Sequence, residues 1–175
     1  ALGVKMLEGA EAKGMILRWG NFEGAEMPWS SFQEADLTGA NLSHTNLSAS
    51  NLRDANLLDA VLQKANLKNA RLQGANLTHV NLQGADLTSA SLQDANLTGA
   101  DLQKAKLSSA SLSGANLSGS DLRGVDFRGA DLRGVKNITV KQLAPAIVDM
   151  RTRLPEGVTF KQIEKYKADV ISESL

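Results

Sequence analysis

The sequence predicts an all-β solenoid, wound as a parallel β-helix with four sides to each coil and followed by a short α-helical cap. A repeat of five residues runs without a break from residue 20 to residue 134, which gives 23 units in one register. The central position of every unit is Leu, Phe or Met, and the position two before the centre is Ala in 16 units. A period of five suits neither a helix nor a strand.

Corners between short sides account for this period. A five-residue step turns about 140° on an α-helix, and on a strand it places alternate leucines on opposite faces. If each unit is instead one short side followed by a corner, all central side chains point to one axis and four units close a 20-residue coil. Ala leaves room for the chain to turn inward at the corner. Parallel crossovers predict a right-handed winding.

The central side chains are expected to form the core of the rod. The position just before the centre is Asn or Asp in 16 units, and these side chains hydrogen-bond nearby backbone in turns. Aromatic residues gather near the first coil, where Trp19 and Trp29 are expected to cap the core together with two phenylalanines. Representative core positions along the rod are Phe22, Met27, Phe32, Leu37, Leu57, Leu77, Leu97, Leu117, Phe127 and Leu132.

The pattern A-(D/N)-L-x-x, as in "ADLTG", "ANLSG", "ADLQK" and "ADLRG", resembles the pentapeptide-repeat family. The resemblance covers about two-thirds of the chain, and "GVKNITVKQL" after the last unit is similar to bacterial and especially cyanobacterial members. It implies a right-handed quadrilateral β-helix. It also implies that one possible function is DNA mimicry, because a subset of the family binds type II topoisomerases such as gyrase in this way.

The segments on either side of the repeat form two further regions. Residues 1–19 keep the register loosely, with Leu7 and Leu17 at centres and Ala12 as an interruption, and they are expected to be an irregular first coil or a short helix over the end. Since the chain begins at Ala1, the removal of a leader stays open.

Residues 135–175 are expected to form two short amphipathic helices. Thr139 with Gln142, and Thr159 with Gln162, have the spacing of capping boxes. The expected role is to cover the open last coil of a monomer. A dimer interface is the alternative, because the resemblance implies dimerisation through C-terminal elements in topoisomerase-binding members. The cap side chains expected to be buried against the last coil are Leu143, Ile147, Phe160 and Ile163.

The composition excludes several classes of function. Lys and Arg number 19, as do Asp and Glu, so no overall charge indicates nucleic-acid binding. The absence of cysteine excludes disulfides, thiolate metal sites and thiol catalysis. No apolar stretch is long enough for membrane insertion, and the cytoplasm is the expected compartment.

The outer columns of the rod offer few candidates for chemistry. One column carries Glu34, Asp54, Gly74 and Asp94, with Arg53 nearby, and carboxylates about 4.8 Å apart could serve a hydrolase or bind calcium. A flat rod has no apolar hollow around them, which favours a solvated, salt-bridged column. His44 and His79 fall on different columns and cannot share a metal.

The sequence therefore favours a non-catalytic structural or protein-interaction scaffold with an unknown protein partner and no cofactor. DNA mimicry is the alternative, but residues 20–134 carry nine Lys and Arg against twelve Asp and Glu, a net charge of −3 that is sparse beside duplex phosphate. An ice-binding surface is a remote alternative, suggested by a column of threonines. That column is interrupted by Leu58 and consists of Thr38, Leu58, Thr78, Thr98 and Ser118.

Overall fold

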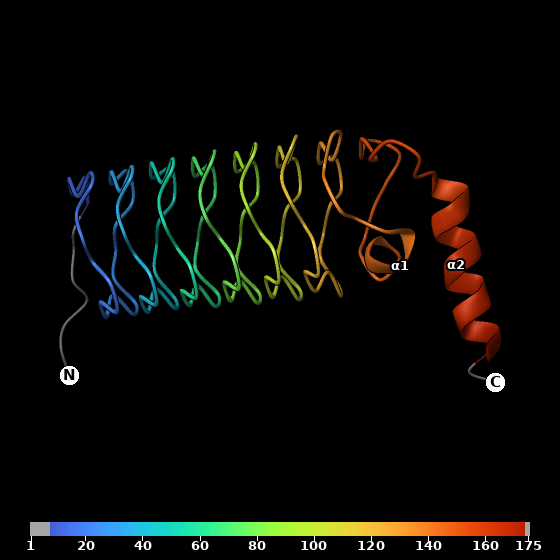
Figure 1. Ribbon diagram of the computed structural model, residues 1–175, viewed down its shortest axis with the longest axis horizontal. Helices are drawn as coiled ribbons and strands as arrows, with labels where there is room; N and C mark the ends of the chain where they lie inside the picture. The colour runs from blue at the N-terminus through green and yellow to red at the C-terminus, as the bar shows by residue number, and fades with distance from the viewer. Residues whose placement is uncertain (1–7, 174–175) are drawn as a thin grey trace.

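The computed structural model describes residues 8–173 and shows a rod of stacked coils that ends in two helices (Figure 1). From residue 8 to residue 136, each five-residue unit contains one short extended stretch and one turn. All 22 bridges from Glu11↔Ser31 to Asn116↔Lys136 are parallel and join residues 20 apart. The predicted β-solenoid with four units per coil is confirmed. Within residues 8–173, no helix has the length and apolar character needed to cross a bilayer.

Backbone hydrogen bonds join each coil to its neighbours. The amide of Leu77 donates to the carbonyl of Asn96 at 2.7 Å, and the amide of Asn96 donates back to the carbonyl of Ala75 at 3.0 Å. At the corner, the amide of Val80 donates to the carbonyl of Leu77 at 3.2 Å. The same bonds recur from coil to coil, so the extended stretches are short because a corner interrupts them after each unit.

An Asn or Asp side chain just before the centre of a unit stabilises the turn that follows it by a hydrogen bond. All 16 of these Asn and Asp side chains in residues 20–134 accept a hydrogen bond from the amide two residues later, at 3.0–3.3 Å. Asn76 and the amide of Thr78 are one example. The repeat keeps Asn or Asp here because the short side chain satisfies an amide that the interrupted strand cannot.

The central side chains fill the interior of the rod. Phe22 is only partly buried and belongs to the first coils that the structure describes. The remaining predicted core side chains are at most 3% exposed: Met27, Phe32, Leu37, Leu57, Leu77, Leu97, Leu117, Phe127 and Leu132.

The two tryptophans do not contribute to the predicted aromatic cap. Trp19 is 71% exposed and Trp29 is 69% exposed. Both occupy the last position of a unit, where the backbone turns with φ of 57° and 62° and the side chain points outward. The Trp19 ring lies across Gly39 of the next coil, in the space that a Cβ atom at Gly39 would need.

The regular coil begins before the predicted boundary at residue 20. The amides of Ala12 and Leu17 donate to the carbonyls of Ser31 and Asp36, both at 2.7 Å, so residues 8–19 are neither irregular nor helical. Ala12 at a centre does not break the coil because the ladder uses backbone groups. The predicted centre at Leu7 lies outside the described residues.

The C-terminal region contains one short and one longer helix. Helix α1 spans Val140–Leu143 and helix α2 spans Phe160–Glu173. Both predicted capping boxes are present, with Gln142 bonded to Thr139 and Gln162 bonded to Thr159. In Figure 1, α1 lies beside the last coils and α2 crosses the end of the rod.

The first predicted helix stops after one turn, and the prediction that it buries Ile147 is wrong. Pro145 has no amide proton to continue the helix. The chain instead returns to the coil, where Ile147 pairs with Asp126 and Arg153 pairs with Asp131. Ile147 therefore takes an outward position and is 48% exposed. Leu143 and Ile163 are fully buried in the core cluster, and Phe160 is half-buried.

Replacement of Leu77 by Ala should lower the free energy of unfolding by about 2–5 kcal/mol, because it leaves a cavity in the middle of the core. Gln83→Ala is the control, since its half-buried side chain only accepts one bond from Gln63, at 2.8 Å, and its loss should cost less than about 1 kcal/mol. Urea unfolding of both variants measures the difference. Equal costs would contradict the inward direction of the leucines.

Candidate functional site

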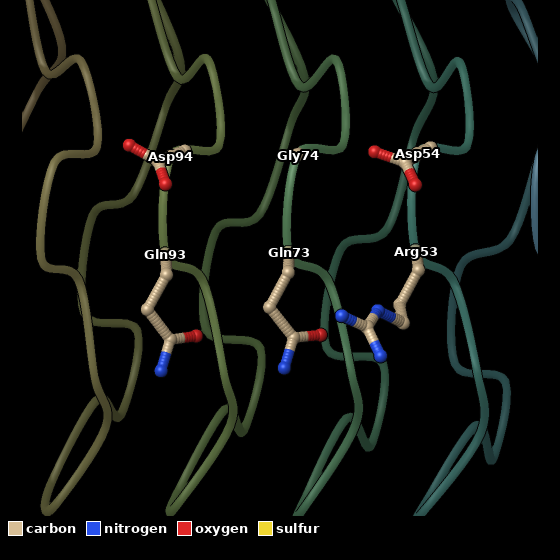
Figure 2. A pocket seen from close by; sticks show the side chains of 6 residues that line it. All are labelled: Arg53, Asp54, Gln73, Gly74, Gln93 and Asp94. Atoms are coloured by element: carbon tan, nitrogen blue, oxygen red, sulfur yellow. The ribbon is translucent and has the colours of Figure 1, made fainter.

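The predicted carboxylate column lies beside a shallow, open depression of about 400 Å³ on one face of the rod (Figure 2). Three successive coils contribute two residues each, both from the turn of a unit. The glutamines stack in parallel along the rod, as the figure shows. The lining residues are Arg53, Asp54, Gln73, Gly74, Gln93 and Asp94.

The aspartates of this depression each lie on a glycine of the next coil. A carboxylate oxygen of Asp54 occupies the space that a Cβ atom at Gly74 would need, and Asp94 lies over Gly114 in the same way. Asp54 and Asp94 are therefore separated by two coils, roughly 9.6 Å along the axis. Within residues 8–173, no group of three or more His, Asp or Glu side chains could hold a metal ion.

The glutamines bring polar atoms to this face without a catalytic arrangement. The side-chain oxygens of Gln73 and Gln93 are buried and accept no hydrogen bond from any described residue. The depression contains amide, guanidinium and carboxylate groups, and it lacks a hydroxyl or imidazole that a carboxylate could activate. It could bind a polar group, but these residues supply neither a nucleophile–base pair nor a metal centre.

The histidines lie apart, as their columns predict. The Nδ1 atom of His79 is 3.6 Å from a carboxylate oxygen of Asp59 one coil earlier, and the His79 ring lies over Gly99. His44 belongs to another column, so the two imidazoles do not meet.

The threonine column has its hydroxyl groups already engaged. Thr98 donates to Asn96 at 2.6 Å and accepts from the side-chain amide of Asn116 at 3.0 Å. Thr78 is bonded in the same two ways, to Asn76 and from Asn96. These hydroxyls satisfy the protein's own amides, which argues against an array that orders ice.

Aspartate–arginine pairs two residues apart encircle the last coils. The Arg128 guanidinium donates to Asp126 and lowers the pKa of that carboxyl from its ordinary 3.8 to about 2. Arg133 acts on Asp131 in the same way and also lowers its pKa to about 2. These pairs sit on the coils that adjoin the cap, so charge is locally balanced there.

Asp149 extends this set into the chain that follows α1. Partial desolvation raises the pKa of Asp149, but bonds from the Arg151 side chain, from the Gly129 and Arg151 amides and from Thr152 outweigh it and bring the pKa to about 2. The bond from the Gly129 amide ties the returning chain to the last regular coil, at 3.0 Å.

A second hollow, which the sequence did not predict, lies between the last coil, α1 and α2. It has a volume of about 440 Å³ and a mainly apolar lining. Val170 and Ile171, at the exposed end of the apolar face of α2, form one side of this hollow, and Pro145 also lines it. Its lining residues are Arg123, Lys141, Ala144, Pro145, Tyr166, Lys167, Val170 and Ile171. The signal available in the sequence was a stripe on residues 160–171 longer than one coil end requires.

The family model for pentapeptide repeats matches residues 30–69, 65–103 and 100–136. These stretches together span more than half of the chain, which therefore belongs to the pentapeptide-repeat family. A search of curated protein sequences gives no match to the chain.

Solved structures with a similar fold include several cyanobacterial pentapeptide-repeat proteins. Rfr23 from Cyanothece 51142 is 28% identical over 85% of this chain and 90% of its own, with a TM-score of 0.43. HetL from Nostoc sp. strain PCC 7120, involved in heterocyst differentiation regulation, is 27% identical over 87% and 75%, with a TM-score of 0.38. QnrB1, a plasmid-mediated fluoroquinolone resistance protein, is 18% identical over 98% and 95%, with a TM-score of 0.40.

The free energy of unfolding should fall as the pH drops from about 4 to about 2. The unfolded chain takes up protons near pH 3.8, whereas Asp126, Asp131 and Asp149 hold pKa values of about 2 when folded. Replacing Arg128 and Arg133 by Gln should flatten this dependence, as measured by thermal unfolding from pH 5 to pH 2. Lys64→Gln is the control, because Lys64 pairs with no described carboxylate. An unchanged slope in the double variant would contradict the role of these pairs.

Proposed function

We propose that this chain is a non-catalytic protein-interaction scaffold: a right-handed, four-sided rod whose faces are held mostly by the rod's own hydrogen bonds and whose ends make contacts. The observation that carries the proposal is the position of the exposed apolar side chains. The large apolar side chains exposed in residues 8–173 fall at the two ends of the rod and none between residues 30 and 146. They are Met15, Ile16, Trp19, Trp29, Ile147, Met150, Val170 and Ile171.

The faces between the ends are occupied by the rod's own hydrogen bonds. The side-chain oxygens of the 16 Asn and Asp residues before centres hold turn amides, and the hydroxyls of Thr78 and Thr98 bond to neighbouring asparagines. Since these groups are already paired, a partner gains little by binding them. Apolar side chains at the ends gain free energy when a partner covers them.

The same bonds weigh against DNA mimicry. Duplex DNA presents a phosphate charge about every 1.7 Å, and a mimic needs unpaired carboxylates at a similar density. Here Asp121, Asp126 and Asp131 each pair with an arginine two residues later, and Asp86 lies near both Lys68 and Lys106. We also propose that the intact chain is a monomer in the cytoplasm, in keeping with its lack of cysteine.

The scaffold proposal predicts that a partner depends on an end of the rod. Immobilised protein would be used to capture partners from a lysate of the host organism, with Trp29→Ser and Ile171→Asp as end variants. Gln103→Ala, in the middle of one face, is the matched control. We expect at least one protein to bind the parent and the control and to be lost from one end variant. An identical set of proteins on all four baits would contradict the proposal.

A gyrase supercoiling assay separates the scaffold from the DNA mimic. The proposal predicts that supercoiling is unchanged at low micromolar protein. Inhibition at that concentration, abolished by Asp-to-Asn changes on one face and unaffected by the end variants, would favour mimicry instead.

A further inference from the structure

We propose that the hollow between the last coil, α1 and α2 binds an amphipathic helical segment of a partner protein that carries acidic residues beside its apolar side chains. This rests on the proposed scaffold function and assigns a chemistry to one of its ends. The hollow combines an apolar floor with three cationic side chains, Arg123, Lys141 and Lys167. A partner segment therefore needs apolar anchors and carboxylates together.

The first half of α2 covers the rod, and the second half is left uncovered. Ile163 is fully buried and Tyr166 is partly buried against the core, whereas Val170 is 44% exposed and Ile171 is 64% exposed. In Figure 1 the end of α2 extends past the edge of the coils. Burial against the rod thus accounts for the first part of the apolar stripe, and the side chains of Val170 and Ile171 lie partly exposed at its end.

The floor of the hollow is small and flat, because α1 ends there. Ala144 is 3% exposed and carries no side chain beyond Cβ, and Pro145 follows with an exposed ring. A larger residue at position 144 would fill the space between α1 and α2. The hollow has a volume of about 440 Å³, which accommodates two or three aliphatic side chains of a helix laid against α2.

The cations give the hollow its preference for an acidic segment. Lys141 forms no ion pair with any residue in the described part of the chain, Lys167 is 3.1 Å from Glu164, and Arg123 is held by Asp121. A neighbouring hollow of about 380 Å³ also has Arg123, Lys141 and Pro145 in its lining. Arg123 and Lys141 therefore form a ridge between the two hollows, where carboxylates that flank an apolar anchor could reach them.

The same charges disfavour a second copy of this chain as the occupant. A two-fold dimer places the same patch of each subunit against its copy. Lys141, which has no carboxylate partner among the described residues, would then share an interface with its own copy, and such a like-charge contact costs free energy. An acidic helix covers the same apolar surface and neutralises the ridge.

The test is fluorescence anisotropy of a labelled peptide titrated with the intact chain. The probe is a helical peptide of about 14 residues, roughly four turns, with Leu at positions i, i+3, i+4 and i+7 and Glu at the flanking positions. We expect saturable binding that weakens about tenfold or more with Lys141→Glu and with Val170→Asp. Lys165→Glu, on α2 but outside the lining of the hollow, is the matched control and should bind as the parent does. Circular dichroism and thermal unfolding establish that the variants are folded.

Three outcomes would overturn the assignment. Equal binding of the peptide with Lys in place of Glu would show that charge plays no part. Equal weakening by Lys165→Glu would show that binding is not at the hollow. Sedimentation of the parent as a dimer that Val170→Asp converts to monomer would show that a second copy occupies it. The scaffold proposal stands in the first two cases if a captured partner still depends on Trp29, and it fails separately if no partner depends on either end.

Discussion

Every coil of this rod is joined to the next by parallel backbone hydrogen bonds that place each residue beside the residue 20 positions later. These hydrogen bonds use backbone groups only. The central position of a unit can therefore be Ala, as at Ala12, or Met, as at Met27, without loss of the ladder. The bonds also fix what each side chain meets. Leucines stack on leucines inside the rod, and each outward residue has one neighbour above it and one below. The core and the outer faces are both consequences of this register.

Because of this register, few polar side-chain groups on the outer faces lack a hydrogen-bond partner. Asn and Asp before the centres hold the turns, and side chains at the turns lie on glycines of the next coil, as Asp54 lies on Gly74 and His79 on Gly99. A face built in this way is flat, and its shallow depression gathers no set of groups that can activate one another. Among the described residues, large exposed apolar side chains are confined to the first described coils and to the region that follows the last regular coil. Binding at the ends is therefore a physical consequence of a well-satisfied repeat.

Much of the fold could be predicted from the sequence because one short pattern repeats the same physical demands. The inward leucines, the turn-forming Asn and Asp and both capping boxes follow from residue types at fixed spacings. The region after the last unit is less predictable from the sequence, because no repeat pattern fixes which of its residues turn, pair or become buried. Thr139, Val140 and Leu143 suggest a helix, but Pro145 stops it, and the returning chain meets the coil with offsets of 21 and 22 residues in place of 20.

The candidate sites show the same contrast. The period of 20 predicts the carboxylate column and also places Gln73 and Gln93 one above the other. It does not predict that their side-chain oxygens are buried without a hydrogen-bond partner among the described residues. The size of Trp19 and Trp29 favours a place in the core, but their position in the unit directs both side chains outward. The hollow beside α2 depends on where Pro145 ends α1 and on how far α2 extends past the rod. Neither feature follows from a local pattern.

The central claim is the register itself, and cysteine pairs test it directly because the chain has no cysteine. Ser91 and Ser111 are paired across adjacent coils, so their Cα atoms are about 4.8 Å apart, within the range of a disulfide. Asp101 lies two units from each of them, on the opposite side of a coil. Under mild oxidation, the account predicts rapid disulfide formation in the variant with Ser91→Cys and Ser111→Cys, and none in the variant with Ser91→Cys and Asp101→Cys, although its cysteines are closer in sequence. Rapid closure of the second pair, or failure of the first in a folded protein, would contradict the stacked register.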